Sequence, residues 1–320
     1  MRPNQCRFVL LKDRFTDFDV LSQRVRGFGM DWLQLDSGPL DVAVQQIGYP
    51  SVLLSRFRFN RKFHQRGAPP PGMLTFAILS PQSPPVRWGR HDSGRGRMVV
   101  FPTEEDYQFV SRPGFAGDTI SISKEVLQGA ADLLEYDLKT TMPHGQGFID
   151  VDPDAAARVR RLLTSIHTMP ESEPGSRGTL DREFEVASAL LQMIGRRRTH
   201  VDFRVTPRKR RSALERALAF IDQHAQQSPL IEDMCHAAGT SWRTLDYAFR
   251  EEFDMTPKQY LDARRLIGVR RDLVRTSPET PISEVSKRWG FTHQSWFSDA
   301  YKNKFGELPS ATRRDRTADG

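Results

Sequence analysis

The sequence has little cysteine and no long apolar run. Its 320 residues include only two cysteines, Cys6 and Cys235, which lie far apart and have no metal-ligating partners at zinc spacing. Their scarcity argues against a disulfide framework or a zinc finger and is typical of a reducing cytoplasm. No apolar run approaches the ~20 residues that a membrane-spanning helix needs. The apolar stretch Phe8–Leu11 is too short for a signal peptide, so we expect a cytoplasmic protein.

Excess charge is missing from the first part of the chain. Residues 1–195 contain 23 Lys and Arg and 23 Asp and Glu, which cancel. Residues 196–320 contain the remaining 24 basic and 17 acidic residues, so the whole net charge of +7 lies there. A neutral region joined to a basic one predicts that only the basic region meets a polyanion, although a basic surface that merely aids solubility has the same charge. The length of the chain predicts two domains.

Short strands are predicted in the neutral region. Apolar residues alternate with polar ones at 40–45 and 52–60, and further short runs lie at 98–101 and 119–123. Breaks rich in proline and glycine separate these runs, for example GAPPPG at 67–72. The pattern indicates a small barrel or sandwich.

From about Lys124 the pattern becomes helical. Amphipathic periodicity predicts helices at Asp152–His167 and Leu180–Ile194. Residues 196–212 carry eight Arg and Lys and almost no apolar periodicity, which predicts a basic linker. Beyond it the chain reads as wholly helical, and three Ser-Pro or Thr-Pro pairs predict helix starts with the hydroxyl residue as N-cap. These pairs are Ser228-Pro229, Thr256-Pro257 and Thr280-Pro281; Thr256 and Gln259 also fit a capping box.

An internal repeat lies inside the basic region. The triplet that begins at Ala248 recurs as a similar triplet at Ala300, 52 positions later, and a downstream Phe and Pro recur at the same offset. In each copy an apolar-patterned helix leads to a glycine, Gly239 or Gly290, that suits a left-handed turn. A second helix follows each glycine. Two helix-turn-helix units in register are therefore predicted, each with its second helix suited to the major groove of DNA.

The detailed motif extends this prediction. From Gly239 the chain reads GTSxxTLxxAF, and from Gly290 it reads GFxxxxxFxxxYKxxFGxxPS. Over about 100 residues these motifs resemble the AraC/XylS family of bacterial transcription regulators. Departures from the family pattern are Asp254 in place of a glycine, Gly268 within the linking helix Pro257–Val274, and Thr312 in place of a tyrosine.

The resemblance implies an α+β chain with a β-rich, barrel- or cupin-like N-terminal domain with flanking helices, followed by an all-α DNA-binding domain. The implied divisions are an effector-binding and dimerisation domain at 1–195, a basic linker at 196–212, the DNA-binding domain at 213–316 with helix-turn-helix units at 229–250 and 279–302, and a tail at 317–320.

Matching positions to the family gives the candidate DNA contacts. The base-reading candidates are Arg243, Asp246, Tyr247, Gln294, Ser295, Trp296, Ser298 and Asp299. The phosphate candidates are Ser241, Arg250, Lys287, Arg288, Lys302 and Lys304. Arg243 suits guanine, Gln294 suits adenine, and Asp246 either accepts from cytosine, rejects wrong bases or orients Arg243. Packing against the linking helix is the structural alternative for Trp296.

The neutral domain shows no catalytic or cofactor motif, and we expect neither a metal nor another cofactor. It loosely resembles the sensor domains of ethanolamine-operon-type regulators, which implies a small-molecule effector of unknown identity. The mixture of arginine and aromatic residues at Phe57–Phe63 lines either a pocket or an exposed strand face. The apolar stripe Phe184, Ala187, Leu191 and Ile194 either pairs with a second copy or packs on its own sheet.

The leading hypothesis is a sequence-specific regulator, an activator and homodimer, with double-stranded DNA as partner and RNA polymerase as a candidate partner. One alternative is a barrel-fold metabolic enzyme with an appended DNA-binding domain, against which the lack of a His/carboxylate cluster at 40–125 argues. Another is a non-specific architectural DNA binder, which the polar outward faces of both recognition helices disfavour.

Overall fold

The computed structural model describes residues 10–88, 91–93, 96–103, 106–138, 147–169, 176–195, 200–202 and 208–318. The described chain divides into two compact units. The first takes its residues from 1–31, 41–60 and 65–204, and the second from 32–40, 61–64 and 205–320. Cys6 and most of the predicted linker at 196–212 lie outside the described residues.

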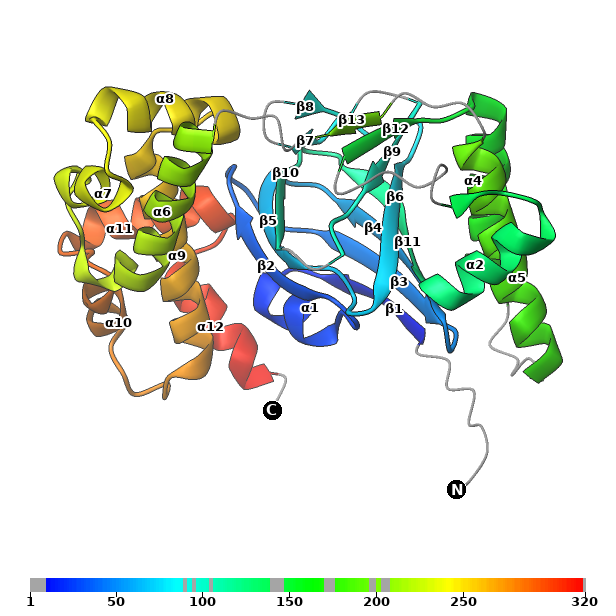
Figure 1. Cartoon of the computed structure of the whole chain (residues 1–320). Coiled ribbons are helices and arrows are strands. Elements are labelled where there is room, and N and C mark those ends of the chain that lie inside the picture. Colours follow the sequence, from blue (N-terminus) through cyan, green and yellow to red (C-terminus); the bar gives the residue numbers. More distant parts are fainter. Residues whose placement is uncertain are drawn as a thin grey trace, which may run out of the picture. The chain divides into compact units, whose positions relative to one another are not determined.

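The strands form two sheets, most of whose residues belong to the first unit (Figure 1). The larger has the strand order β1-β3-β4-β11-β6-β9-β12-β13, with bounds β1 Leu10–Phe15, β3 Val42–Gly48, β4 Val52–Phe59, β11 Ala116–Ser123, β6 Met73–Leu79, β9 Arg97–Val100, β12 Gly147–Asp150 and β13 His200–Asp202. The smaller has the order β2-β5-β10-β7-β8, with bounds β2 Gly29–Gln34, β5 Phe63–Ala68, β10 Tyr107–Val110, β7 Arg87–Trp88 and β8 His91–Asp92. Helix α1 is Phe18–Arg24.

Aromatic side chains fill the space between the two sheets. Phe57 and Phe59 of β4 point inward with Trp88, Tyr107 and Phe109 of the smaller sheet, and these rings stack with centroids about 6 Å apart. The cavity that remains among them has a volume of about 40 Å³. The interior is therefore closely packed, and it gives the first unit an aromatic core.

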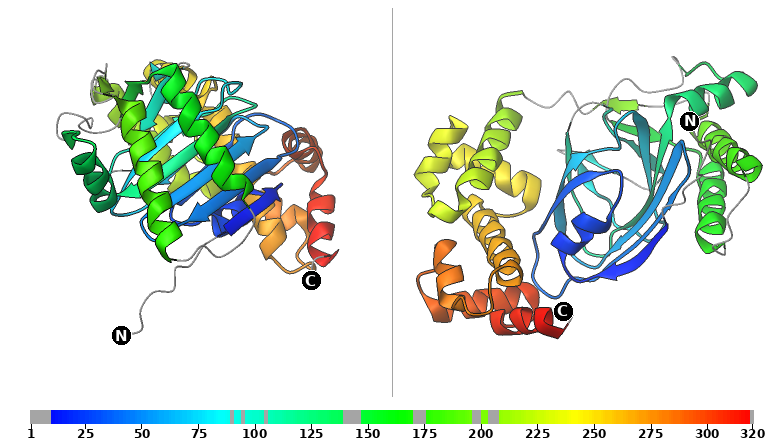
Figure 2. Two further views of the ribbon diagram at one scale, coloured as in Figure 1. Left: turned by 90° about the vertical axis from the view of Figure 1, so that its right-hand side faces the viewer. Right: turned by 90° about the horizontal axis from the view of Figure 1, so that it is seen from below.

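Helices α2 (Lys124–Leu133), α4 (Pro153–Thr168) and α5 (Ser176–Ile194) cover the outer face of the larger sheet. Figure 2 shows α4 and α5 lying across its strands. A second core forms there, with Val52, Leu54, Ile120 and Ile122 on the strands and Leu163 on α4. The predicted β-rich region with flanking helices is thus confirmed.

The contacts of α5 decide between the two alternatives for its apolar stripe. Ala187, Leu191 and Ile194 are buried in the core beneath α5, whereas Phe184 is 38% exposed. Of the two alternatives for this stripe, the structure favours packing against its own sheet. The hypothesis of a self-pairing face on these residues is wrong for three of the four, because their apolar surface is already removed from water.

The helices of the second unit are α6 Arg208–His224, α7 Ile231–Ala238, α8 Trp242–Phe253, α9 Pro257–Arg275, α10 Ile282–Arg288, α11 Gln294–Phe305 and α12 Pro309–Ala318, with the 3-10 turn η2 at Ala225–Gln227. This arrangement confirms two helix-turn-helix units joined by a long helix. Figure 1 shows α7 and α8 at one end of α9 and α10 and α11 at the other.

Capping explains where these helices start. Thr256 and Gln259 form the predicted capping box at the start of α9. The other two predicted caps are wrong: α7 starts after Leu230, whose N–H donates to Asp233, and α10 starts after Pro281. Ser228 is instead left-handed, with φ 54°, and ends the turn η2.

Candidate nucleic-acid interface

The first helix-turn-helix unit consists of α7 and α8. Buried Met234 and Ala238 anchor α7, and Gly239 ends it in the left-handed conformation with φ 61°. Ser241 then caps α8, with its Oγ accepting from the Thr244 N–H at 3.3 Å. A glycine turn followed at once by a side-chain cap fixes where the recognition helix begins.

The apolar face of α8 sets which side chains point outward. Leu245, Ala248 and Phe249 are buried, as the sequence predicts. The opposite face exposes aromatic and cationic groups: Trp242 is 46% exposed, Tyr247 is 54% exposed, and Arg243 is also exposed. Flat aromatic surface beside a guanidinium is suited to base edges and thymine methyl groups.

Two charged residues of α8, Asp246 and Arg250, form an ion pair with each other, and a third, Arg243, is not part of it. Arg250 Nε lies 2.8 Å from Asp246 Oδ2, one helical turn away. Arg243 makes no side-chain hydrogen bond or ion pair with any described residue, so its planar donors are available. Asp246 pairs with Arg250 through Oδ2 and not with Arg243, which argues against the role of orienting Arg243, whereas its Oδ1 is buried and has no hydrogen-bond partner among the described residues.

The second unit consists of α10 and α11. Val285 is buried on α10, Gly290 has φ 78° in the turn, and Phe297 and Tyr301 bury the inner face of α11. His293 precedes α11 but forms no side-chain cap. The turn is tied differently from the first: Ser286 and Gln294 exchange hydrogen bonds at 3.0 and 3.2 Å.

Gln294 is thus engaged inside the protein. Its Nε2 donates to Ser286 Oγ at 3.0 Å and also lies 3.3 Å from the Phe291 carbonyl. These bonds use the amide that would otherwise pair with adenine. These hydrogen bonds brace the turn, and they compete with the predicted pairing of Gln294 with adenine.

The outer face of α11 is formed by short polar groups and one indole. Ser295 and Asp299 are exposed, and Ser298 is half-buried. Trp296 is 53% exposed, and its ring lies 5.7 Å from that of Phe291. The alternative for Trp296, packing on the linking helix, applies instead to a different tryptophan.

Trp289 packs against the linking helix α9 at Gly268. A Cβ placed at Gly268 would lie 2.2 Å from the indole ring, so only glycine admits this approach. The indole Nε1 also donates to Asp272 Oδ2 at 2.7 Å. The glycine at position 268 therefore allows the second helix-turn-helix unit to pack closely against α9.

The phosphate candidates fall into two groups. Lys287, Arg288 and Lys302 are exposed, and Arg288 pairs with Glu284 on its own helix. Lys304 is buried; burial lowers its pKa to about 8, and its Nζ donates to the Gln34 carbonyl at 2.8 Å within the second unit. We therefore leave Lys304 out of the phosphate-binding set proposed below.

The other two departures also have structural roles. Asp254 takes the left-handed position after α8, with φ 56°, and donates its N–H to the Arg250 carbonyl. Aspartate tolerates this conformation better than most residues. Thr312 fills a buried polar site, with its Oγ1 2.8 Å from the Tyr301 hydroxyl and 2.7 Å from Glu307 Oε1.

Sequence comparison agrees with this geometry. Residues 234–315 match the family described as the helix-turn-helix domain. The chain is 32% identical over 130 residues to the XylDLEGF operon transcriptional activator of Pseudomonas putida, a match that covers 40% of this chain and 39% of that protein. The C-terminal region is an AraC-type helix-turn-helix domain. This assignment concerns the domain, because the chain spans about a third of the length of the curated relatives it matches.

Two other proteins are also similar to this chain. The probable thc operon regulatory protein of Rhodococcus erythropolis is 33% identical over 99 residues, 31% of this chain and 30% of that protein. The crystal structure of the AraC-like transcriptional activator CuxR has a TM-score of 0.37 and 13% identity, covering 71% of this chain and 80% of that chain.

Two negative observations concern the described residues alone. Among them, no three His, Cys, Asp or Glu side chains gather in a way that could hold a metal ion. No helix in the described part of the chain is long and apolar enough to cross a membrane.

Proposed function

We propose that the protein is a sequence-specific DNA-binding transcription regulator that reads two successive major-groove segments with α8 and α11. One observation carries the proposal: two helix-turn-helix units in the same compact unit, joined by α9, both turn a polar and aromatic face outward while their apolar faces are buried. The names of the relatives, an operon activator and an operon regulatory protein, support the same role.

The exposure and the hydrogen bonds of the candidate residues support a division of roles among them. We assign base reading to Arg243, Tyr247, Ser295, Trp296, Ser298 and Asp299. We assign phosphate binding to Arg250, Lys287, Arg288 and Lys302, and to Ser241 only as the helix cap. Asp246 serves by holding Arg250 across one helical turn, which presets the direction of that guanidinium.

A selection of binding sites from random DNA tests the proposal with the full-length protein. Two recognition helices predict two short elements about 10 bp apart, centre to centre, on one face of the duplex. Affinity for the selected site should exceed that for random competitor DNA by at least about 10³-fold. A pool that never converges, or equal affinity for random DNA, would show a non-specific binder and refute the proposal.

Activation of transcription, the homodimer, the bacterial origin and contact with RNA polymerase stay predictions of the sequence. So does the response to a small effector. The closely packed aromatic interior of the first unit, with about 40 Å³ of free volume, is too small for such a molecule.

A further inference from the structure

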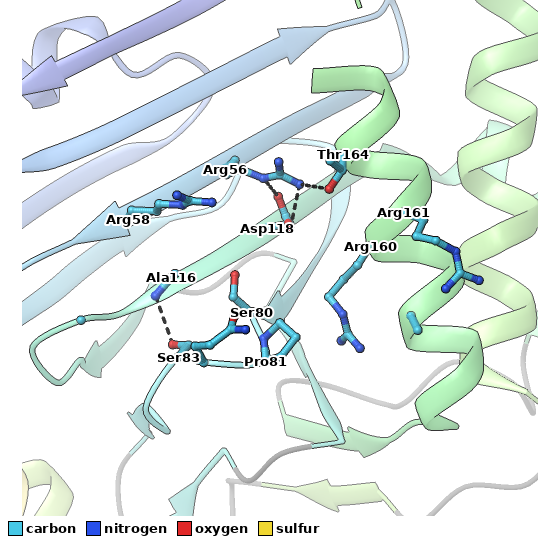
Figure 3. A pocket seen from close by; sticks show the side chains of 13 residues that line it. Arg56, Arg58, Ser80, Pro81, Ser83, Ala116, Asp118, Arg160, Arg161 and Thr164 are labelled. Carbon is cyan, nitrogen blue, oxygen red and sulfur yellow. Dashed lines mark hydrogen bonds and ion pairs between the residues drawn. The ribbon is translucent and has the colours of Figure 1, made fainter. Parts of the chain in front are cut away.

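A pocket of about 760 Å³ lies on the outer face of the larger sheet in the first unit. Its floor is formed by β4 and β11, one wall by α4, and the other by the turn after β6 (Figure 3). This volume falls within the roughly 300–1,000 Å³ of ordinary ligand sites, whereas the interior cavity of the same unit is far smaller.

The pocket arises where the apolar face of the sheet changes to a charged one. Side chains alternate along a strand, so Val52, Leu54, Arg56 and Arg58 of β4 share the face beneath the helices. Val52 and Leu54 are buried against the helices. Further along the strand Arg56 and the exposed Arg58 replace them, and an open cationic pocket forms there between the sheet and α4.

One arginine in the pocket is fully partnered and acts as its support. Arg56 faces Asp118 across the β4–β11 pair, with Nε 2.6 Å from Oδ1, and its Nη2 lies 3.1 Å from Thr164 Oγ1 on α4. Burial raises the pKa of Asp118, and the hydrogen bond from Arg56 opposes that rise. This network joins the sheet to the helix and uses the single carboxylate that lines the pocket.

Three other arginines line the pocket, Arg58, Arg160 and Arg161, and none of them forms an ion pair with any described residue. Arg58 extends from β4 and Arg160 from α4, on either side of the pocket, as Figure 3 shows. Asp118 attracts both only at longer range, because its carboxylate is bonded to Arg56. Arg160 is half-buried, and burial lowers its pKa. A guanidinium that is partly desolvated and not ion-paired is stabilised when an anion binds it.

The positive potential also reaches the core below. His167, further along α4, is buried, and neither ring nitrogen has a hydrogen-bond partner among the described residues. Burial and the charge of Arg56 lower its pKa to about 4, so the imidazole is neutral at pH 7. The pocket therefore gains no proton-dependent charge from it, and its excess cationic charge comes from arginine alone.

We propose that this pocket binds a small organic anion bearing two or more carboxylate or phosphate groups, held between Arg58 and Arg160. Both groups offer the paired oxygens that a guanidinium binds bidentately. Asp118 is bonded to Arg56, and among the described residues no other acidic side chain lines the pocket. A role of this anion as effector rests on the proposed regulator function; the binding itself does not.

Isothermal titration of the full-length protein tests the binding, with citrate as the carboxylate probe, inorganic pyrophosphate as the phosphate probe and glycerol as the neutral control. Saturable binding of one of the anions is expected, and which one binds identifies the chemistry. Arg58→Gln and Arg160→Gln should each weaken it about tenfold or more. Arg158→Gln is the matched control, because Arg158 is exposed on α4 outside the pocket.

Circular dichroism spectra and urea unfolding midpoints equal to those of the unsubstituted protein would show that the Gln variants fail for lack of the guanidinium rather than of folding. No saturable binding of either anion, or equal weakening by Arg158→Gln, overturns the pocket. DNA affinity is measured on the same samples. Loss of anion binding with intact DNA recognition refutes only the pocket, whereas anion binding without DNA recognition refutes only the proposed regulator.

Discussion

The two helix-turn-helix units have the same framework and different outer faces. At the 52-residue offset the buried positions stay apolar: Leu245 corresponds to Phe297, and Phe249 to Tyr301. The outward positions do not correspond in kind, because Arg243 is replaced by Ser295. The repeat thus preserves the packing of the second helix but not its chemistry.

The turns differ as well. In the first helix-turn-helix unit Ser241 caps α8. Arg243 on the same helix is exposed and unpaired among the described residues. In the second unit Gln294 is bonded to Ser286, and the remaining outward groups are short or apolar. We infer that α8 supplies most of the base-specific hydrogen bonds, and that α11 contributes shape, apolar contact and register. Substitutions that remove one of these features at a time test this inequality.

The largest effect is expected for Gly268→Ala, which disrupts the packing of the second helix-turn-helix unit against α9. The new methyl group would overlap the Trp289 ring, which lies 2.2 Å from that position, and overpacking of this kind costs about 1–3 kcal/mol or more. Urea unfolding followed by circular dichroism should show the destabilisation. Gly129→Ala in α2 is the matched control, since nothing lies within 4 Å of its Cβ position, and it should stabilise by about 0.5–1 kcal/mol. Equal stabilisation by both variants would contradict the packing at Trp289.

Arg243→Ala should have the next largest effect, on DNA recognition. Without its bidentate pair to guanine, binding weakens by about 1–3 kcal/mol and specificity relaxes at one base position. Binding to a library of single-base variants of the selected site measures both effects. Arg250→Ala, the same charge change on the same helix, should weaken all sites alike. An unchanged base preference in Arg243→Ala would remove Arg243 from the set of base readers.

Gln294→Ala should change stability rather than base preference. It leaves Ser286 Oγ without its partner across the turn, which costs about 1 kcal/mol. Urea unfolding measures the first quantity and the same DNA library the second. A changed preference at one position with unaltered stability would reverse the assignment and restore Gln294 as a reader of adenine.

Lys302→Ala should have the smallest effect, spread evenly over all DNA sequences. Lys302 is exposed near the end of α11. Because the variant loses one ammonium contact to a DNA phosphate, the slope of log affinity against log salt should fall in magnitude by about 1. Titrations at several salt concentrations measure this slope. If the weakening were confined to particular base sequences, Lys302 would be a reader and the division between the two helices would need revision.

The framework of the second unit could be predicted from the sequence because its signals are local. Gly239, Gly290 and the capping box at Thr256 act within a few residues, and each has the predicted position. The predicted caps at Ser228 and Thr280 are wrong because α7 begins after Leu230, whose N–H donates to Asp233, and α10 begins after Pro281. Competition between neighbouring capping residues is decided by the path of the chain, which the pattern alone does not contain.

The features that could not be predicted from the sequence depend on distant contacts. Lys304 looks like a surface lysine but donates to the Gln34 carbonyl, which is remote in sequence. Arg58 and Phe59 are adjacent, yet they lie on opposite faces of β4, one in the cationic pocket and one in the aromatic interior. Strand alternation in the sequence could have predicted that the arginines and the aromatic residues of β4 lie on opposite faces. It could not have predicted that Arg160 lies near Arg58, because that depends on how α4 packs on the sheet.

The inequality of the two recognition helices has one direct test. Each base pair of the selected site is replaced in turn, and the affinity of the full-length protein is measured for every variant; the position that Arg243→Ala makes tolerant identifies the element read by α8. We predict penalties of about 1–3 kcal/mol per base pair in that element and clearly smaller ones in the element one helical turn away. Equal penalties in the two elements, or larger ones in the element read by α11, would contradict this inequality.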